Sequence, residues 1–236
     1  MIRIFKIVGK ILLALMLTLV VISAAVFFFY NEKLPEGEQS AEADQLAEKM
    51  LIAVHHEAYK QTNYIEWSFI GRQHYKWNKQ QQMVEVKWGK TVVNLNIQHP
   101  DSSSVILNNR ELEGSARLEL IEQAVAHFNN DSFWLIAPHK VFDRGTERRI
   151  VSLENGEKAL LVSYSSGGNT PGDSYLWLLN ESGLPTAFKM WVSVIPVGGV
   201  EATWESWKTS QSGALFPSHH KLLFVDIKME GVKATK

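Results

Sequence analysis

The chain has 236 residues, of which 45% are hydrophobic and 21% charged, a balance typical of a folded globular protein and not of a disordered one. Cysteine is absent, which excludes a disulfide framework, thiolate metal sites and the lipid-modified N-terminal cysteine of a bacterial lipoprotein. The 24 basic and 25 acidic residues include no basic run interleaved with aromatic residues, so nucleic acid is not an expected partner.

Residues 11–30 form an uncharged apolar run that predicts a transmembrane helix. At 1.5 Å per residue it spans about 30 Å, the thickness of the hydrocarbon core of a bilayer. Basic residues precede the run and acidic residues follow it: Arg3, Lys6 and Lys10 before, and Glu32, Glu36, Glu38, Glu42 and Asp44 after. The positive-inside rule then predicts a single-pass protein of the inner membrane, with a cytoplasmic N-terminus and a periplasmic C-terminal domain. Residues 1–31 are the basic flank and anchor, and Phe28 to Tyr30 suit an interfacial aromatic belt.

A cleaved signal peptide is the competing interpretation of the same run. Ser23 and Ala25 are small residues of the kind that precede a cleavage site. Cleavage there would leave the apolar residues 26–30 as the mature N-terminus, which favours a retained anchor, and both interpretations stay open.

Residues 32–40 contain Pro35 and Gly37 and predict a short linker, followed by a domain over residues 41–236. Ser40 is placed to cap a helix from Ala41 to about Gln61. A second helix is expected from Gly114 to about Asn129, and the apolar stretch 133–142 is interrupted by Pro138.

The rest of the domain alternates apolar and polar residues as strands do. Strands are expected at 64–70, 73–78, 84–88 and 93–97, and again at 149–153, 158–164, 174–179, 186–194, 200–208 and 221–229. Short turns such as Asn155-Gly156 connect the later strands, which indicates antiparallel pairing. Several strands are apolar on both faces. We therefore predict an α+β fold with a strongly curved antiparallel sheet, a half-open barrel, packed on two or three helices.

The signatures of common catalytic sites are missing. The chain has no Gly-x-Ser-x-Gly elbow, Walker loop, His-Glu-x-x-His motif or dinucleotide fingerprint. His55 and His56 lie about 100° apart on a helix, and His219 and His220 point to opposite faces of a strand, so neither pair chelates one ion readily. No cofactor, metal or catalytic residue is therefore expected.

A few polar residues are candidates for a binding site. His139 and Asp143 follow the apolar stretch 133–142, and Asp173 follows Pro171-Gly172. Asp143 and Asp173 also suit turn residues that accept backbone N–H bonds. Glu201 and Glu205 share a strand face. A solvated face is a simpler interpretation of this pair than a general-acid site.

The tryptophans are spread over nearly every expected strand. Ordinary core packing is one interpretation, and an apolar cavity is the other, because ligand sites are concave and rich in aromatic residues. The cavity candidates are Trp67, Trp77, Trp88, Trp134, Trp177, Trp191 and Trp204.

Three segments carry a resemblance to known proteins. They are residues 133–143 (FWLIAPHKVFD), residues 168–180 (GNTPGDSYLWLLN) and Gly183-Leu184-Pro185. These segments resemble an uncharacterised family of secreted bacterial proteins. The order of helices and strands is similar to the periplasmic lipoprotein carriers and receptors (LolA/LolB-like). The resemblance implies a lipoprotein-carrier-like domain over residues 41–236, with a curved sheet around an apolar cavity, but fold alone does not grant function.

The sequence thus favours a membrane-tethered, non-enzymatic binding protein with an apolar cavity for a lipid, acyl chain or hydrophobic peptide. An envelope scaffold with a filled core is the alternative. A hydrolase with an unrecognised His/carboxylate site is the lesser one.

Overall fold

An antiparallel sheet of 13 strands is the framework of the computed structural model, which describes residues 2–166 and 170–236. The side chains of residues 2–9, 22–24 and 26 lie outside the described residues. The helices are α1 (Ile2–Tyr30), α2 (Ala41–Ala53), α3 (His56–Lys60) and α4 (Ser115–Ile136), with 3-10 turns η1 (Pro100–Ser102) and η2 (Ala137–Lys140). The strands are β1 (Tyr64–Phe69), β2 (Gln73–Asn78), β3 (Met83–Trp88), β4 (Thr91–Asn96), β5 (Ser104–Leu107), β6 (Arg110–Glu111), β7 (Thr146–Ser152), β8 (Lys158–Tyr164), β9 (Ser174–Leu179), β10 (Pro185–Trp191), β11 (Val200–Thr203), β12 (Lys208–Thr209), β13 (Leu215–Phe216), β14 (His219–Leu222) and β15 (Val225–Thr235).

The fold is α+β, and its large antiparallel sheet does not close into a barrel. Its strand order is β6-β5-β4-β3-β2-β1-β15-β14-β11-β10-β9-β8-β7, so β6 and β7 are the two edges. Strand β15 joins the two halves, because it pairs with β1 on one side and with β14 on the other. The predicted antiparallel sheet with several helices is confirmed.

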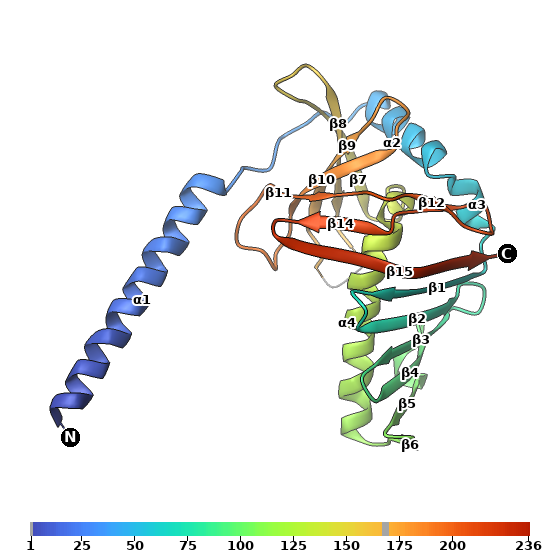
Figure 1. Cartoon of the computed structure of the whole chain (residues 1–236). Coiled ribbons are helices and arrows are strands. Elements are labelled where there is room, and N and C mark those ends of the chain that lie inside the picture. The colour runs from blue at the N-terminus through green and yellow to red at the C-terminus, as the bar shows by residue number, and fades with distance from the viewer. Residues whose placement is uncertain (1, 167–169) are drawn as a thin grey trace.

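The first half of the sheet, β1 to β6, is covered on one face by α4 (Figure 1). Its strands alternate buried and exposed residues, as in β4, where Thr91, Val93 and Leu95 are buried. The buried set packs on Ile121, Phe128 and other residues of α4. One face of this half is core and the other meets solvent.

The second half, β7 to β11, is covered on both faces. On the inner face, Leu160 and Phe188 pack with Met50 of α2. On the outer face, a smaller cluster of Val151, Ala159, Leu161 and Leu176 lies under Leu153, Leu178 and Trp191. Apolar residues on both faces, as predicted for these strands, therefore reflect two layers of cover.

The segment after α1 is fixed to the second half of the sheet. The Glu32 N–H donates to the Gly198 carbonyl at 3.0 Å, and the Asn31 side chain accepts from the Gly198 N–H at 2.8 Å. Glu38 pairs with Ile150 at the β7 edge, at 2.9 and 2.8 Å. The expected linker is thus a docked strap that covers part of an edge strand.

Helix α1 contains residues 11–30, which are predicted to form the anchor. Within the part of the chain that the structure describes, no helix is both long and apolar enough to cross a membrane. The predicted anchor run 11–30 includes residues 22–24 and 26, whose side chains lie outside the described residues. The anchor therefore stays a prediction.

Several expected element boundaries were wrong. The helix expected over 41–61 divides at His55, which has φ 56° and turns the chain between α2 and α3. The helix expected to end near Asn129 continues to Ile136. Strands β5 and β6 were not expected. The strand expected over 221–229 is two strands, β14 and β15, with a tight turn between them.

Candidate functional site

Aromatic rings from four elements and from the segment after β11 meet on the inner face of the second half-sheet. Trp177 of β9 lies 5.2 Å from Phe188 of β10 and 5.0 Å from Trp204, which follows β11 (ring centroids). His220 of β14 lies 4.5 Å from Trp204 and 5.3 Å from Trp134 of α4. Trp177, Trp204 and His220 are at most 1% exposed. Alternating strand residues of one parity bring these rings to one face.

This cluster leaves buried hydrogen-bonding groups unsatisfied. The indole N–H groups of Trp177 and Trp204 have no partner among the described residues. His220 uses Nδ1 toward the Thr203 carbonyl at 2.9 Å. Burial lowers the pKa of His220 to about 4, and the backbones of Thr203 and Trp134 oppose the shift by a smaller amount. The ring is therefore neutral at pH 7, and the cluster contains buried donors that have no acceptor among the described residues.

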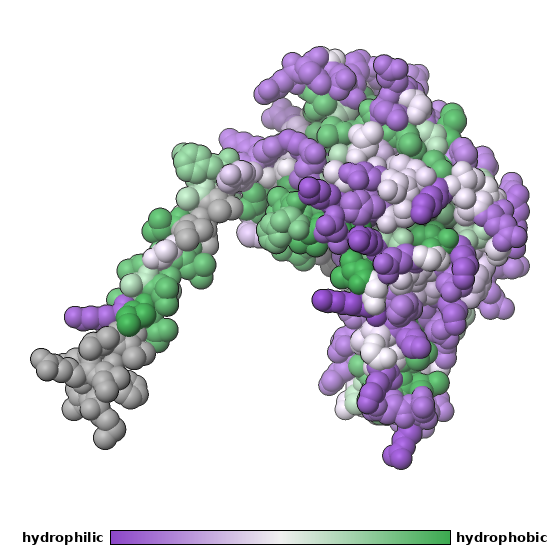
Figure 2. Space-filling model, in the orientation of Figure 1, coloured by the Kyte–Doolittle hydropathy of each residue, from purple (hydrophilic) through white to green (hydrophobic). Residues whose placement is uncertain are grey.

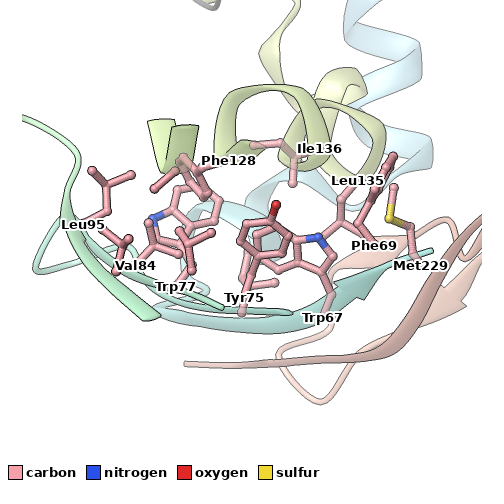
Figure 3. Close-up of a cluster of buried hydrophobic side chains, with 14 of the residues drawn as sticks. Trp67, Phe69, Tyr75, Trp77, Val84, Leu95, Phe128, Leu135, Ile136 and Met229 are labelled. Carbon is pink, nitrogen blue, oxygen red and sulfur yellow. The ribbon is translucent and has the colours of Figure 1, made fainter. Parts of the chain in front are cut away.

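A matching layer lies between α4 and the first half-sheet (Figure 3). Trp67 stacks on Tyr75 at 4.5 Å, and Trp77 meets Phe128 edge to face at 5.2 Å. The indole N–H groups of Trp67 and Trp77 also lack partners among the described residues. The buried face of each half of the sheet thus contains indole donors that have no acceptor in the part of the chain that the structure describes.

Asp131 ties α4 to the sheet. Its carboxylate accepts a hydrogen bond from the Tyr75 hydroxyl, and the residue is only 2% exposed. Burial raises the pKa of Asp131, while the bonds from Tyr75 and Asn130 act in the opposite direction. A buried carboxylate held by a tyrosine hydroxyl is a specific, polar point of attachment between helix and strands.

His139, one of the predicted polar candidates, lies in a second ring cluster. It stacks on Tyr59 at 4.1 Å, and its Nδ1 lies 3.3 Å from Nδ1 of His56. Burial lowers the pKa of His139 well below its usual range. Lys79 lies 3.6 Å from the Tyr59 ring centre, and burial lowers the pKa of Lys79 to about 8. The described residues contain no group of three or more His, Cys, Asp or Glu side chains that could hold a metal ion.

Asp143 and Asp173 have local structural contacts. Asp143 forms an ion pair with Lys140, and its carbonyl accepts from the Thr146 N–H at 3.1 Å. Asp173 is 5% exposed, and its carboxylate accepts hydrogen bonds from the Ser193 N–H at 3.0 Å and from the Thr170 hydroxyl. Among the described residues, neither aspartate side chain has a hydrogen bond to His139, so these contacts do not test the predicted polar site.

A surface triad of charged groups was not predicted. His219 lies between Glu205, at 3.1 Å from Nδ1, and Asp226, at 2.9 Å from Nε2. The hydrogen bonds to Asp226 and Glu205 raise the pKa of His219. The prediction that His219 and His220 point to opposite faces describes the structure well, because His219 is at the surface and His220 is buried.

The remaining predicted cavity residues are dispersed. Trp88 is half-buried, and its ring lies 5.3 Å from the ring of His127, in the middle of α4. Trp191 lies on the outer face of the sheet, where its N–H donates to the Glu32 carbonyl at 2.8 Å. A hollow of about 410 Å³ opens near β7 and β8 and contains none of the predicted tryptophans. Its lining is Gln39, Gly145, Thr146, Glu147, Ser163, Tyr164, Ser165 and Gly172.

Comparisons with known proteins add a structural likeness. A crystal structure of a DUF1329 family protein from Desulfovibrio piger ATCC 29098 is similar over 83% of this chain and 93% of that one, with a TM-score of 0.39 and 8% sequence identity. No family model matches the chain, and no curated protein matches it. The likeness to an uncharacterised protein at this level carries no argument about activity or ligand.

Proposed function

We propose that the chain is a membrane-tethered binding protein whose concave interior takes an apolar ligand with hydrogen-bond acceptors, such as an acyl chain with ester or carboxyl oxygens. The ligand would lie between the sheet and α4, and no catalysis is involved. Residues 11–30 would anchor the chain in the inner membrane, with the domain on the periplasmic side.

Four buried indole N–H groups that find no partner among residues 2–166 and 170–236 carry this proposal. They belong to Trp67, Trp77, Trp177 and Trp204, which are all at most 9% exposed. A buried donor without an acceptor costs about 1–3 kcal/mol, and native proteins satisfy nearly all such groups. Ligand oxygens in this interior would satisfy them, and the surrounding rings would bury the ligand's chain.

Helix α4 is the element that would have to yield. Trp134 packs against both cores from α4, and Phe128 and Asp131 hold the helix to the first half-sheet. The rings beneath are in contact with one another, so an acyl chain needs α4 to separate from the sheet. The hydrogen bond between Tyr75 and Asp131 would be the polar latch in that movement.

An envelope scaffold is the second candidate function. Its supporting observation is the filled interior, where Trp67, Trp177 and Trp204 are at most 2% exposed and neighbouring rings lie 4.5–5.5 Å apart. A core already filled to this degree needs no ligand to complete it.

Photo-crosslinking in membranes separates the two candidates. The full chain would be exposed to diazirine-bearing fatty acids of increasing length, and the labelled peptides mapped. The binding proposal expects labels on α4 and on β9–β10, with affinity rising roughly fourfold per added methylene, because each buried methylene contributes about 0.8 kcal/mol. Labels confined to residues 11–30, on a folded chain, would contradict binding and favour the scaffold.

A pair of matched variants tests the indole donors themselves. Trp177→Phe and Trp204→Phe keep an aromatic ring and remove the N–H, so each should reduce interior labelling roughly tenfold, the equivalent of about 1.4 kcal/mol. Trp207→Phe is the control, because its N–H already donates to the Pro185 carbonyl at 3.1 Å. Equal labelling of all three variants would argue against the role of the unpartnered donors.

A further inference from the structure

The turn between β14 and β15 has unusual chemistry. Leu222 pairs with Val225, so Leu223 and Phe224 form a two-residue hairpin turn. Leu223 has φ 53°, whereas Phe224 does not have a positive φ. A positive φ at the first central residue alone is the pattern that favours glycine at that position. The backbone of a leucine at this position is strained, so the formation of the turn does not explain why a leucine is present.

The same turn exposes large apolar side chains. Leu223 is 65% exposed and Phe224 is 90% exposed. Burying a leucine or phenylalanine side chain is favourable by roughly 1.5–3 kcal/mol relative to leaving it in water. A strained turn that holds such side chains in water suggests a surface that is covered in the working protein.

Another exposed apolar residue lies beside this turn. Val194, in the loop between β10 and β11, is 74% exposed. Strand β11 pairs with β10 through Met190 and Val200, and with β14 through Ala202 and Leu222. This register puts the loop and the hairpin turn at the same end of the sheet, two strand spacings or about 10 Å apart. We name Val194, Leu223, Phe224 and Val225 the apolar tip.

The chain itself connects the apolar tip to the end of α1. Glu32 is hydrogen-bonded to Gly198 in the same β10–β11 loop, and only Asn31 separates it from Tyr30, the last residue of α1. Two residues span at most about 7 Å, so the loop cannot move far from that helix end. Phe28, Phe29 and Tyr30 at this end are 71–81% exposed.

The figures agree with this placement. The β14–β15 turn and the β10–β11 loop lie on the side of the domain that faces α1 (Figure 1). Apolar residues are grouped on this side of the domain, which faces the apolar helix (Figure 2).

From these observations we propose that the apolar tip dips into the interface of the lipid bilayer in which α1 is anchored. This inference rests on the anchoring proposed above. The aromatic residues at the end of α1 would lie at the headgroup level, where aromatic side chains are favoured, and the docked strap would hold the β10–β11 loop at the same level. The tip would fix the orientation of the domain over the membrane, as a second contact beside the anchor.

The absence of cysteine makes the test straightforward. Single-cysteine variants of the full chain would carry an environment-sensitive fluorophore, and each would be reconstituted in liposomes with lipids brominated near the headgroup or along the acyl chain. Phe224→Cys and Val194→Cys report on the tip. Val20→Cys reports on α1, and Ile52→Cys is the control, since Ile52 is 76% exposed on α2.

The proposal expects a blue-shifted emission and quenching by the shallow bromolipids at positions 224 and 194, and neither at position 52. Quenching at position 20 but not at 224 and 194 would overturn the apolar tip and leave the anchor standing. An unquenched position 20 would show that the anchoring is wrong, and the inference would fall with it.

A second variant separates a role in folding from a role at the membrane. Leu223→Gly with Phe224→Asn installs a favoured hairpin turn. This double variant should unfold at a higher temperature than the parent and should lose the quenching at position 194. A lower unfolding temperature would show that the two side chains serve the fold, and would contradict the proposal.

Discussion

The two halves of the sheet differ in how many of their faces are buried. In β1 to β6 one face packs on α4 and the other meets solvent, with ion pairs such as Lys76–Glu85 across neighbouring strands. In β7 to β11 both faces are covered, the inner one by α2 and α4 and the outer one by the strap after α1. A strand that is apolar on both faces thus indicates a second covering layer, which in this chain comes from residues close to the predicted anchor.

The largest expected effect lies in the inner core of the second half. Trp177→Ala should reduce the free energy of unfolding by about 3–5 kcal/mol, because Trp177 is fully buried between Leu160 and Phe188 of the flanking strands. Trp88→Ala, at a half-buried position in the first half, should cost about 1 kcal/mol. Urea unfolding monitored by circular dichroism measures both. Equal costs would mean that the second half is no better packed than the first.

The second prediction concerns pH. His220 is neutral in the folded chain because its pKa is lowered to about 4, whereas the unfolded chain takes up a proton on this ring below about pH 6.5. The contribution of His220 to stability is therefore complete above pH 6.5 and declines as the pH falls toward 4, by about 3 kcal/mol in all.

His220→Asn keeps a donor for the Thr203 carbonyl at the position of Nδ1 and removes the titration. The difference in unfolding free energy between parent and variant should then depend on pH between 6.5 and 4. A difference that stays constant over this range would show that the second half does not hold His220 neutral. Other titrating groups, such as Asp131, are common to both proteins and cancel.

The third prediction tests the outer layer alone. A Cβ at Gly198 would lie 2.4 Å from Cδ1 of Trp191 and 2.7 Å from the Glu32 carbonyl oxygen, so Gly198→Ala should push the strap away from the sheet. We expect a loss of about 1–3 kcal/mol. Hydrogen exchange at the amides of Glu32 and Glu38 should accelerate, while that of β2 and β3 should not change. Uniform acceleration across the sheet would contradict a separate outer layer.

The smallest effect is expected on the solvent face of the first half. Glu85→Gln removes the ion pair with Lys76, in which Lys76 Nζ lies 2.9 Å from Glu85 Oε1. The Lys76 side chain is 51% exposed and the Glu85 side chain 35%. Exposed pairs contribute little, so the free energy of unfolding should change by less than about 1 kcal/mol. A larger loss would mean that this face is covered in the folded protein.

Much of the fold could be predicted because side-chain alternation sets the strands. The expected strands 73–78, 158–164 and 174–179 match β2, β8 and β9. The hairpin at Leu223-Phe224 was missed because the sequence there lacks the usual glycine and asparagine, so the apolar run looked like one continuous strand. The break at His55 was missed for the same reason, since a histidine with positive φ gives no signal in the sequence.

The candidate site was harder to predict than the fold. The tryptophans divide between the inner core, where Trp177 and Trp204 meet, and the outer layer, where Trp191 contacts the strap. Nothing in their spacing shows which face of the sheet the strap will cover. The adjacent pair His219-His220 predicts no chelating site, and only the alternation of His220 with the apolar Leu222 indicates that its side chain faces the interior.

Native mass spectrometry of the full chain, released from membranes in a gentle detergent, would show whether the interior holds a ligand. The binding proposal predicts that one molecule of acyl-chain mass stays with each folded chain, and that it is lost in the Trp177→Phe, Trp204→Phe double variant but retained in Trp207→Phe. A parent chain that carries no ligand in any preparation, with its fold intact, would contradict binding in the concave interior and leave the filled scaffold.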